Sequence, residues 1–190
     1  MYQKYHTEAL VLRARESGEN DRVFSLYTKD FGLVRARASA VRAEHSKMRY
    51  ALQDYSRASV SLVKGKRGWR LAGAAALKSV CGERKSIAAF ARIAELTTRL
   101  VHGEERSDYL YAALAEAHDA LMREDVAASA TIEIVCVARV LYALGYLSAE
   151  AFETALFTHT AYEREHVLEA ETIRDKLLSS INRAIAETHL

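Results

Sequence analysis

Apolar and polar residues alternate with the two-residue period of β-strands along much of the first 76 residues. The first such segment, residues 7–15, is rich in β-forming residues and ends before Gly18, where the chain is able to turn. Residues 21–29 alternate in the same way and lead into a second turn that contains Gly32. These two segments are therefore expected to pair as a β-hairpin.

A third strand is expected over residues 33–42, with small and apolar side chains on one face and arginines on the other. Its outer face therefore has a basic row that includes Arg35 and Arg37. Residues 44–50 are polar and basic without a clean period, which predicts a loop.

Residues 52–63 and 69–76 alternate again, and a basic turn with a glycine on each side, residues 64–68, joins them. Five short strands with a basic face and scattered aromatic rings are typical of the OB-fold, a five-stranded barrel that binds oligonucleotides. An SH3-like barrel is the nearest alternative.

The period of the apolar residues changes to that of helices from about residue 79 onward. The most apolar segment, residues 131–146, is expected at the centre of a helical bundle. The fold class is therefore predicted as α+β with two domains: a five-stranded OB-fold β-barrel in residues 1–78, followed by an all-α helical domain in residues 79–190. Helices are expected over residues 87–101, 107–121, 132–144, 148–157 and 163–187.

The net charge of +2 conceals two blocks of opposite sign. Residues 1–80 contain 16 Lys and Arg against 7 Asp and Glu, whereas residues 81–190 contain 11 against 18. Such asymmetry suggests a module that binds a polyanion, joined to a domain of another kind. The alternative is that both blocks are ordinary solvated surface.

Ten cations come from segments that a five-stranded barrel brings together, and neutralising the phosphates of a nucleic acid needs such a set. The predicted DNA-binding cations are Arg13, Arg15, Arg35, Arg37, Arg42, Lys47, Arg49, Lys64, Lys66 and Arg67. Tyr50 and Trp69 flank basic turns and are candidates for base stacking, which contributes about 1–3 kcal/mol per base. A small barrel needs aromatic side chains inside, so Phe24, Tyr27 and Tyr55 are expected in the core instead.

Other classes of function find little support in the sequence. No apolar segment is long enough to cross a membrane and the start has no signal-peptide pattern, so a cytoplasmic location is expected. Cys81 and Cys136 stand alone and the histidines are scattered, so neither zinc nor another cofactor is expected. No nucleotide-binding or hydrolase motif is present, which argues against an enzyme.

The order of motifs in the first domain resembles the amino-terminal barrel of the RecO family of DNA repair proteins. The resemblance lies in EALVLRARESGENDRVFSLYTKDFGLVRARASAVR followed by ALQDYSRASVSLV, with Gly18-Glu19, Asp21-Arg22, Thr28, Gly32 and Arg42 in the family's places. In the second domain, Leu-Gly-Tyr at residues 144–146 after an apolar helix is similar to the family's helical domain.

The resemblance implies a recombination mediator without catalytic activity. Such a protein binds single- and double-stranded DNA, anneals complementary strands, binds the tail of the single-stranded DNA-binding protein SSB, and works with RecR in loading RecA. Arg139, on the helix before Leu-Gly-Tyr, is the candidate contact to the acidic SSB tail, and the alternative is an ordinary exposed arginine. Some relatives carry a four-cysteine zinc segment after this helix, and this chain lacks those cysteines.

Three other functions compete with this interpretation. An OB-fold accessory protein that binds RNA or single-stranded DNA would show the same barrel, and relative affinity for RNA and DNA would separate it. A helical protein-docking module would use the acidic half and need no nucleic acid. A nuclease is the least favoured, because the sequence lacks the clustered carboxylates that hold catalytic metal ions.

Overall fold

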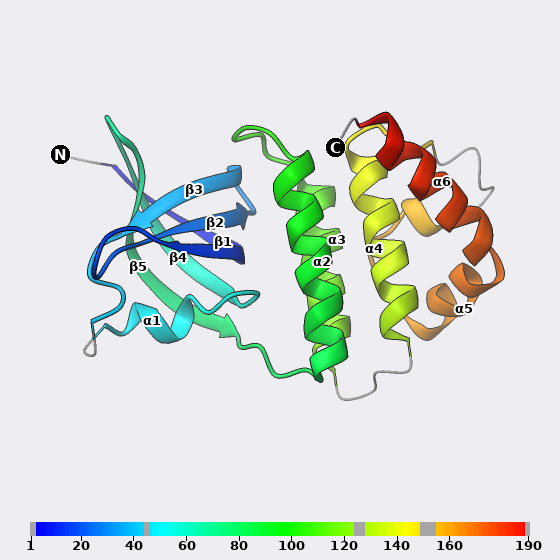
Figure 1. The fold of residues 1–190 in the computed structure, drawn as a ribbon, viewed down its shortest axis with the longest axis horizontal. Coiled ribbons are helices and arrows are strands. Elements are labelled where there is room, and N and C mark those ends of the chain that lie inside the picture. The colour runs from blue at the N-terminus through cyan, green and yellow to red at the C-terminus, as the bar shows by residue number, and fades with distance from the viewer. Residues whose placement is uncertain (1–2, 44–45, 124–127, 149–154, 189–190) are drawn as a thin grey trace. The chain divides into compact units, whose positions relative to one another are not determined.

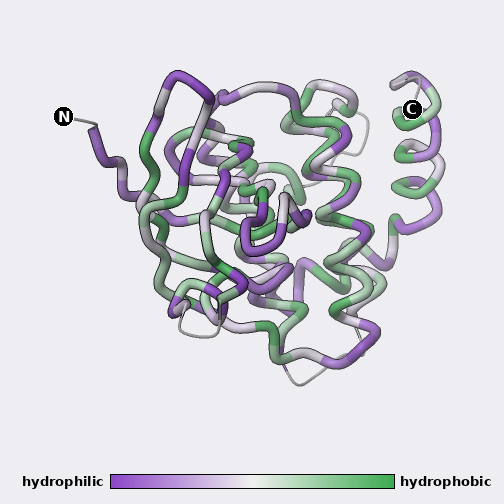
Figure 2. Tube along the Cα trace, turned by 60° about the vertical axis from the view of Figure 1, so that its left-hand side comes forward, coloured by the Kyte–Doolittle hydropathy of each residue, from purple (hydrophilic) through white to green (hydrophobic). Residues whose placement is uncertain are grey.

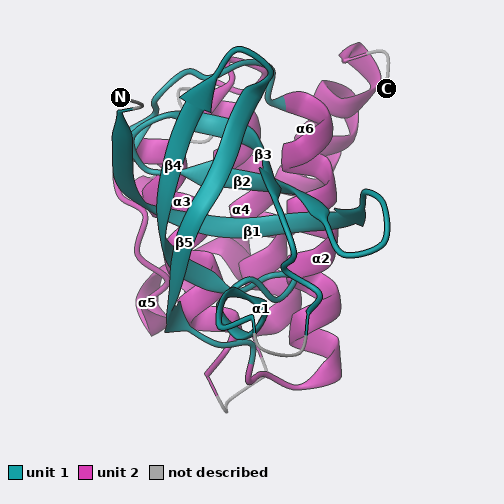
Figure 3. Cartoon of the chain, turned by 90° about the vertical axis from the view of Figure 1, so that its left-hand side faces the viewer, with its two compact units in different colours: residues 1–80, 101–108 teal, residues 81–100, 109–190 magenta. Residues whose placement is uncertain are grey.

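The computed structural model describes residues 3–43, 46–123, 128–148 and 155–188. The chain divides into two compact units, shown in different colours in Figure 3. Unit 1 contains residues 1–80 and 101–108, and unit 2 contains residues 81–100 and 109–190. Each unit is described by itself.

Unit 1 is a closed five-stranded barrel with the strand order β1-β2-β3-β5-β4. All neighbouring strands are antiparallel except β3 and β5, which pair in parallel. This five-stranded closed barrel is the expected OB-fold. Its strands, labelled in Figure 1, are β1 (Lys4–Glu16), β2 (Arg22–Thr28), β3 (Gly32–Ala38), β4 (Arg57–Gly65) and β5 (Gly68–Lys78).

Strand β1 closes the barrel because it is long enough to pair on both sides. Residues 4–10 pair with β4, and residues 9–16 pair with β2. A bulge between Val11 and Arg13 bends the strand between these two partners. The inward-facing residues form one apolar core, whose largest members are Trp69, Phe24, Leu26, Leu52 and Leu62.

The connection from β3 to β4 differs from the expectation. A short helix, α1 (Met48–Ala51), lies where a loop was predicted, and β4 begins at Arg57 instead of residue 52. Burial of Ala51 and Leu52 favours the helical turn over an extended chain. The Ser56 hydroxyl donates to the carbonyl oxygens of Ala51 (3.0 Å) and Gln53 (2.8 Å), which delays the strand.

Residues 101–108 group with the barrel and not with the helices. Glu104 accepts hydrogen bonds from the Trp69 indole N–H (2.8 Å) and the Lys64 ammonium (2.7 Å). Gly32 has a φ of +62°, and a Cβ there would collide with the carbonyl oxygen of Glu105. The position of this segment was not expected from the sequence, and the domain boundary after residue 78 stays a prediction.

Unit 2 is helical. Hydrophobic and hydrophilic residues alternate along its final helix near the carboxyl terminus, as the colouring of Figure 2 shows. Its elements are α2 (Arg84–Leu100), α3 (Asp108–Leu121, of which Asp108 belongs to unit 1), α4 (Ser129–Ala143), the 3₁₀ turn η2 (Ala155–Phe157), α5 (Arg164–Thr172) and α6 (Arg174–Glu187). The described part of the chain has no helix long and apolar enough to cross a membrane.

Of the helices expected near the carboxyl end, one is wrong and one lies mostly outside the described residues. The single helix predicted over residues 163–187 is two helices, because Ile173 leaves the helical conformation with φ −110° and ψ 14°. Of the helix expected over residues 148–157, residues 149–154 lie outside the described part of the chain. The last three residues of that segment form the 3₁₀ turn.

Arg139 is neither an exposed arginine nor available to a partner in this structure, because its exposed fraction is 0%. Its guanidinium donates to the carbonyl oxygens of Leu156 (2.9 Å), Thr160 (2.7 Å) and Ala161 (3.2 Å) and lies 4.5 Å from the Tyr162 ring centroid. The side chain thereby fixes the irregular segment between η2 and α5 on helix α4. Sequence periodicity placed Arg139 on α4 but did not reveal this segment as its partner.

His159 and His166 stack with ring centroids 3.8 Å apart. The Arg139 guanidinium donates to Nδ1 of His159 (3.4 Å), so that ring must be neutral to accept. Burial, and then the neighbouring His166 and Arg139, lower the pKa of His159, and Glu169 and Glu116 oppose this shift. His159 therefore favours the neutral form in the folded protein.

Replacing Arg139 with Leu should destabilise the protein by about 3 kcal/mol or more, because one buried and two partly buried carbonyl groups lose their donor. The matched control is Arg92→Leu. Arg92 forms a 2.6 Å ion pair with Glu133 at the surface, and such pairs contribute about 0–1 kcal/mol. Urea unfolding followed by circular dichroism measures both, and equal losses would contradict the structural role of Arg139.

Stability should also fall on acidification in a way that depends on His159. Its folded pKa is lowered, so the unfolded chain binds the proton more tightly, and stability present above the ordinary pKa of about 6.5 is lost as the pH falls through that value. The melting temperature should therefore drop between about pH 7 and about pH 5. His159→Gln should flatten this part of the profile, whereas an unchanged profile would remove His159 as its source.

Candidate nucleic-acid interface

Strand register brings four of the predicted arginines into two adjacent rows on the outer face of the barrel. Arg13 on β1 and Arg35 on β3 both pair with Ser25 of β2, which lies between them. Arg15 and Arg37 pair in the same way with Val23. Directly paired residues point to the same face of a sheet, and the rows lie two residues, or about 7 Å, apart. All four side chains are exposed.

Arg70 extends the second row and was missed by the sequence analysis. It pairs in parallel with Arg37, and its side chain is exposed. Trp69 points into the barrel, so the next residue along β5, Arg70, points to the outer face. The pairing of β5 with β3 was not visible in the sequence. We call Arg13, Arg15, Arg35, Arg37 and Arg70 the arginine rows.

Most of the arginine rows carry uncompensated charge. Among the described residues, no carboxylate forms an ion pair with Arg13, Arg15, Arg35 or Arg70. Arg37 donates to Asp21 at 2.7 Å, and Arg42, outside the rows, lies 3.3 Å from Glu16. Exposed pairs of this kind contribute about 0–1 kcal/mol, so phosphate groups are able to compete for both arginines.

Asp21 orders the end of the second row. Its carboxylate accepts the backbone N–H of Ala40 (2.8 Å), a residue with a φ of +52°, and two bonds from Arg37. The Ala40 N–H, and then Arg37, lower the pKa of Asp21. The ionised carboxylate thus holds the turn after β3 and aims Arg37 along the outer face.

The basic turn between β4 and β5 contributes a second, separate group of cations. Lys66 and Arg67 are exposed, and no described carboxylate is paired with them. Lys64 lies over the Trp69 ring (5.0 Å to the centroid) and is paired with Glu104 at 2.7 Å. The Lys64 charge is therefore already compensated, and its place in a binding surface is weaker than that of the other two.

The predicted stacking residue Trp69 is buried, with 6% of its surface exposed. The centroid of its ring lies 5.5 Å from that of Tyr5 and 5.3 Å from that of Phe31, and Glu104 accepts a hydrogen bond from its indole N–H. It fills the barrel and is not presented to a base. The sequence could not show this, because the covering Glu104 is 35 residues away.

Of the two aromatic residues predicted to stack on bases, Tyr50 is the accessible one, with 63% of its surface exposed. Arg49 donates to its hydroxyl (3.0 Å) and lies 5.0 Å from the ring centroid. Phe24 and Tyr27 are buried, as expected, and Tyr55 is half-buried. Burial raises the pKa of Tyr27 well above its ordinary value.

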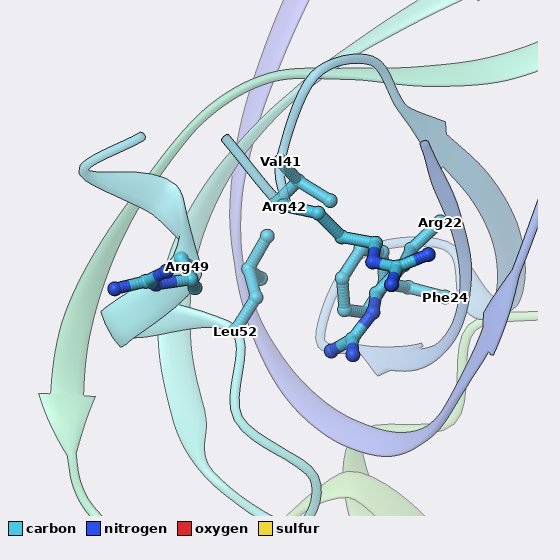
Figure 4. A pocket seen from close by; sticks show the side chains of 6 residues that line it. All are labelled: Arg22, Phe24, Val41, Arg42, Arg49 and Leu52. Atoms are coloured by element: carbon cyan, nitrogen blue, oxygen red, sulfur yellow. The ribbon is translucent and has the colours of Figure 1, made fainter. Parts of the chain in front are cut away.

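Two of the remaining predicted cations, Arg42 and Arg49, line a small cavity of about 180 Å³ in unit 1. Phe24, Val41 and Leu52 form its apolar wall, and Arg22, Arg42 and Arg49 also line it. The guanidinium groups of Arg22 and Arg42 lie near each other, whereas the Arg49 side chain points away from them (Figure 4). Lys47, just before α1, is exposed. Arg22, the first residue of β2, was not among the predicted site residues. Its proximity to Arg42 and Arg49, on the connection from β3 to β4, depends on the tertiary structure.

Unit 2 contains a larger groove, of about 480 Å³, with apolar and cationic walls. Leu168 is 53% exposed there, and Arg123 and Arg164 are exposed beside it. The groove is lined by Ala120, Arg123, Ala128, Ile132, Tyr162, Arg164, Val167, Leu168 and Glu171. No three His, Cys, Asp or Glu side chains of the described residues gather as metal ligands would.

The sequence of the barrel is similar to that of known DNA repair proteins. Residues 1–79 match the family described as Recombination protein O N terminal. The DNA repair protein RecO of Desulfitobacterium hafniense is 42% identical over 62 residues, and that of Dehalococcoides mccartyi is 34% identical over 83 residues. The RecO of Pelotomaculum thermopropionicum is 37% identical over 62 residues.

These alignments cover 33–44% of this chain and only 23–33% of the length of the relatives. The family match covers the barrel strands from β1 to β5 and extends to residue 79. The barrel that carries the arginine rows therefore matches the N-terminal domain of the RecO family over residues 1–79.

Proposed function

We propose that this protein is a DNA-binding recombination mediator in DNA repair. The observation that carries the proposal is the pair of arginine rows on a barrel of the RecO N-terminal family. Guanidinium groups spaced along a flat outer face contact phosphates and sugars without reading base sequence. A mediator must handle any sequence, so this kind of contact suits it.

The proposed activity is annealing of complementary strands and loading of RecA together with RecR. Annealing needs a cationic surface that reduces the repulsion between two phosphate backbones while leaving base edges free. The arginine rows contact backbones, and the exposed Tyr50 offers a ring for an unpaired base. No covalent bond is made or broken in this role. Its proposed place of action is the cytoplasm.

The groove of unit 2 is the proposed site for the SSB tail, in place of Arg139. An acidic peptide with apolar residues needs cations beside an apolar surface, and Arg123 and Arg164 flank the exposed Leu168. A volume of about 480 Å³ lies within the range of pockets that bind small ligands, about 300–1,000 Å³. The groove is thus large enough for the side chains of a few tail residues.

Reversing charge in the first row should weaken DNA binding without unfolding the barrel. Arg13→Glu with Arg35→Glu changes two exposed arginines that lack an ion-pair partner among the described residues, whereas Arg37→Glu would place two carboxylates together beside Asp21. Fluorescence anisotropy with labelled single-stranded DNA over a salt series measures the slope of log affinity against log salt. The slope of the double variant should be smaller than that of the wild-type protein by about 1.4, or about 0.7 per lost phosphate contact.

Arg183→Glu, on the exposed face of α6, is the control for charge alone. It should leave affinity unchanged at the salt concentrations where the double variant binds poorly. Equal losses in both proteins would mean that overall charge, and not the arginine rows, governs binding. Preference for RNA over DNA in the same assay would favour an RNA-binding accessory protein instead.

Arg164→Glu should lower affinity for a synthetic SSB-tail peptide about tenfold, or about 1.4 kcal/mol, because it places a carboxylate against an acidic ligand. DNA affinity should stay the same, since the groove and the arginine rows belong to different units. Isothermal titration calorimetry measures the peptide, and Arg183→Glu again serves as the control. Unchanged peptide binding by Arg164→Glu would exclude this groove as the tail site.

A further inference from the structure

We infer that the Lys64 ammonium and the Trp69 indole N–H form a phosphate site on the barrel, which the side chain of Glu104 occupies until DNA displaces it. This inference rests on the proposed DNA-binding function. It goes further by assigning a DNA contact outside the arginine rows and an acidic residue of the same chain that competes with DNA for it.

Two donors from paired strands converge on one carboxylate. Lys64 of β4 pairs directly with Trp69 of β5, so both side chains point to the same face of the sheet. The ammonium donates to one oxygen of Glu104 at 2.7 Å, and the indole N–H donates to the other oxygen at 2.8 Å. A phosphate group also presents several oxygens on one central atom, so the same two donors are able to bind it in place of the carboxylate.

The packing of the barrel holds the indole donor in position. The Trp69 ring contacts the rings of Tyr5 and Phe31, with centroids 5.5 Å and 5.3 Å away, and those two rings contact each other at 5.3 Å. The indole N–H is partly buried and needs an acceptor, which Glu104 supplies in the free protein. A donor that is already fixed loses little freedom when it binds a phosphate.

The cations in the adjacent turn favour a DNA phosphate over Glu104. Lys66 and Arg67 are exposed, and neither forms an ion pair with a carboxylate of the described residues. The loop between the fourth and fifth strands of an OB-fold commonly contacts oligonucleotides. Glu104 neutralises a single ammonium, whereas a bound strand also supplies phosphates for Lys66 and Arg67.

Displacement requires the movement of one side chain. The backbone beside Glu104 is held, because the carbonyl oxygen of Glu105 lies against Gly32, where a Cβ would not fit. The Glu104 side chain is 41% exposed, and surface ion pairs such as the one with Lys64 contribute little stability. Lys64, and then Trp69, lower the pKa of Glu104 against the opposing effect of burial, so this side chain is an anion at neutral pH and competes with phosphate.

The test compares Glu104→Gln with Glu105→Gln. The second variant is the matched control, because it removes the same charge from the next residue, which is exposed and has no ion pair among the described residues. Glu104→Gln keeps a side-chain oxygen for the Trp69 N–H but no longer neutralises Lys64. Fluorescence anisotropy with labelled oligothymidylate over a salt series gives the affinities, and thermal unfolding verifies that each variant is folded.

Glu104→Gln should raise the affinity for oligothymidylate about fivefold at low salt, because the internal competitor is removed. It should also increase the slope of log affinity against log salt by about 0.7, the value for one more phosphate contact. Glu105→Gln should change the affinity by less than about twofold. Lys64→Gln should abolish the gain when it is combined with Glu104→Gln.

Displacement in the wild-type protein has a separate readout, because Trp69 is the single tryptophan of the chain. Its indole N–H signal in a nitrogen–proton correlation spectrum should shift when oligothymidylate is added. An unshifted signal at saturating DNA would mean that Glu104 keeps its place, and the inference would be wrong.

Equal gains for Glu104→Gln and Glu105→Gln, or no gain for either, would overturn the phosphate site, while DNA binding by the wild-type protein would leave the proposed function standing. Absence of DNA binding by the wild-type protein and by Glu104→Gln at low salt would overturn both. If Glu104→Gln gained affinity for an oligoglutamate peptide and not for oligothymidylate, the site would be one for carboxylates and the inference would be wrong.

Discussion

The double pairing of strand β1 is the constraint on which the rest of unit 1 depends. One strand of 13 residues pairs with β2 along its second half and with β4 along its first half. The bulge at Val11 and Arg13 provides the bend, and it also resets which side chains point outward. A shift of one residue would turn Arg13 and Arg15 toward the core, so the closure of the barrel and its cationic face are determined by the same register.

The same closure accounts for how charges and rings are divided between the inside and the outside. Inward positions are taken by Phe24, Leu26 and Trp69, whereas outward positions on β1, β3 and β5 carry arginines. Cationic side chains this close together repel one another, and the phosphates of the proposed DNA ligand would supply the missing counter-charge. Asp21 and Glu16 offset part of that repulsion at the edge of the rows without covering them.

Unit 2 follows a different rule, in which one buried cation organises irregular backbone. Arg139 donates to carbonyl groups of η2 and of the irregular segment that follows it before α5. His159, stacked on His166, lies beside it and has a lowered pKa that favours its neutral form. The groove lined by Tyr162 and Arg164 begins where this segment enters α5, so the shape of the proposed peptide site depends on an arginine that never touches the peptide.

The sequence by itself determined the strands, the change to helices near residue 79, the charge asymmetry and the arginines of β1 and β3, because these follow from local periodicity and composition. It did not determine which residues that are distant in the chain lie close together in space. Only the tertiary structure decided that Arg70 extends the second row, that Arg22 joins Arg42 and Arg49 at a cavity, and that Glu104 seals Trp69 into the barrel. It also decided that Arg139 is buried. Each of these depends on residues far apart in the chain, and strand pairing or burial between such residues leaves no local pattern to read.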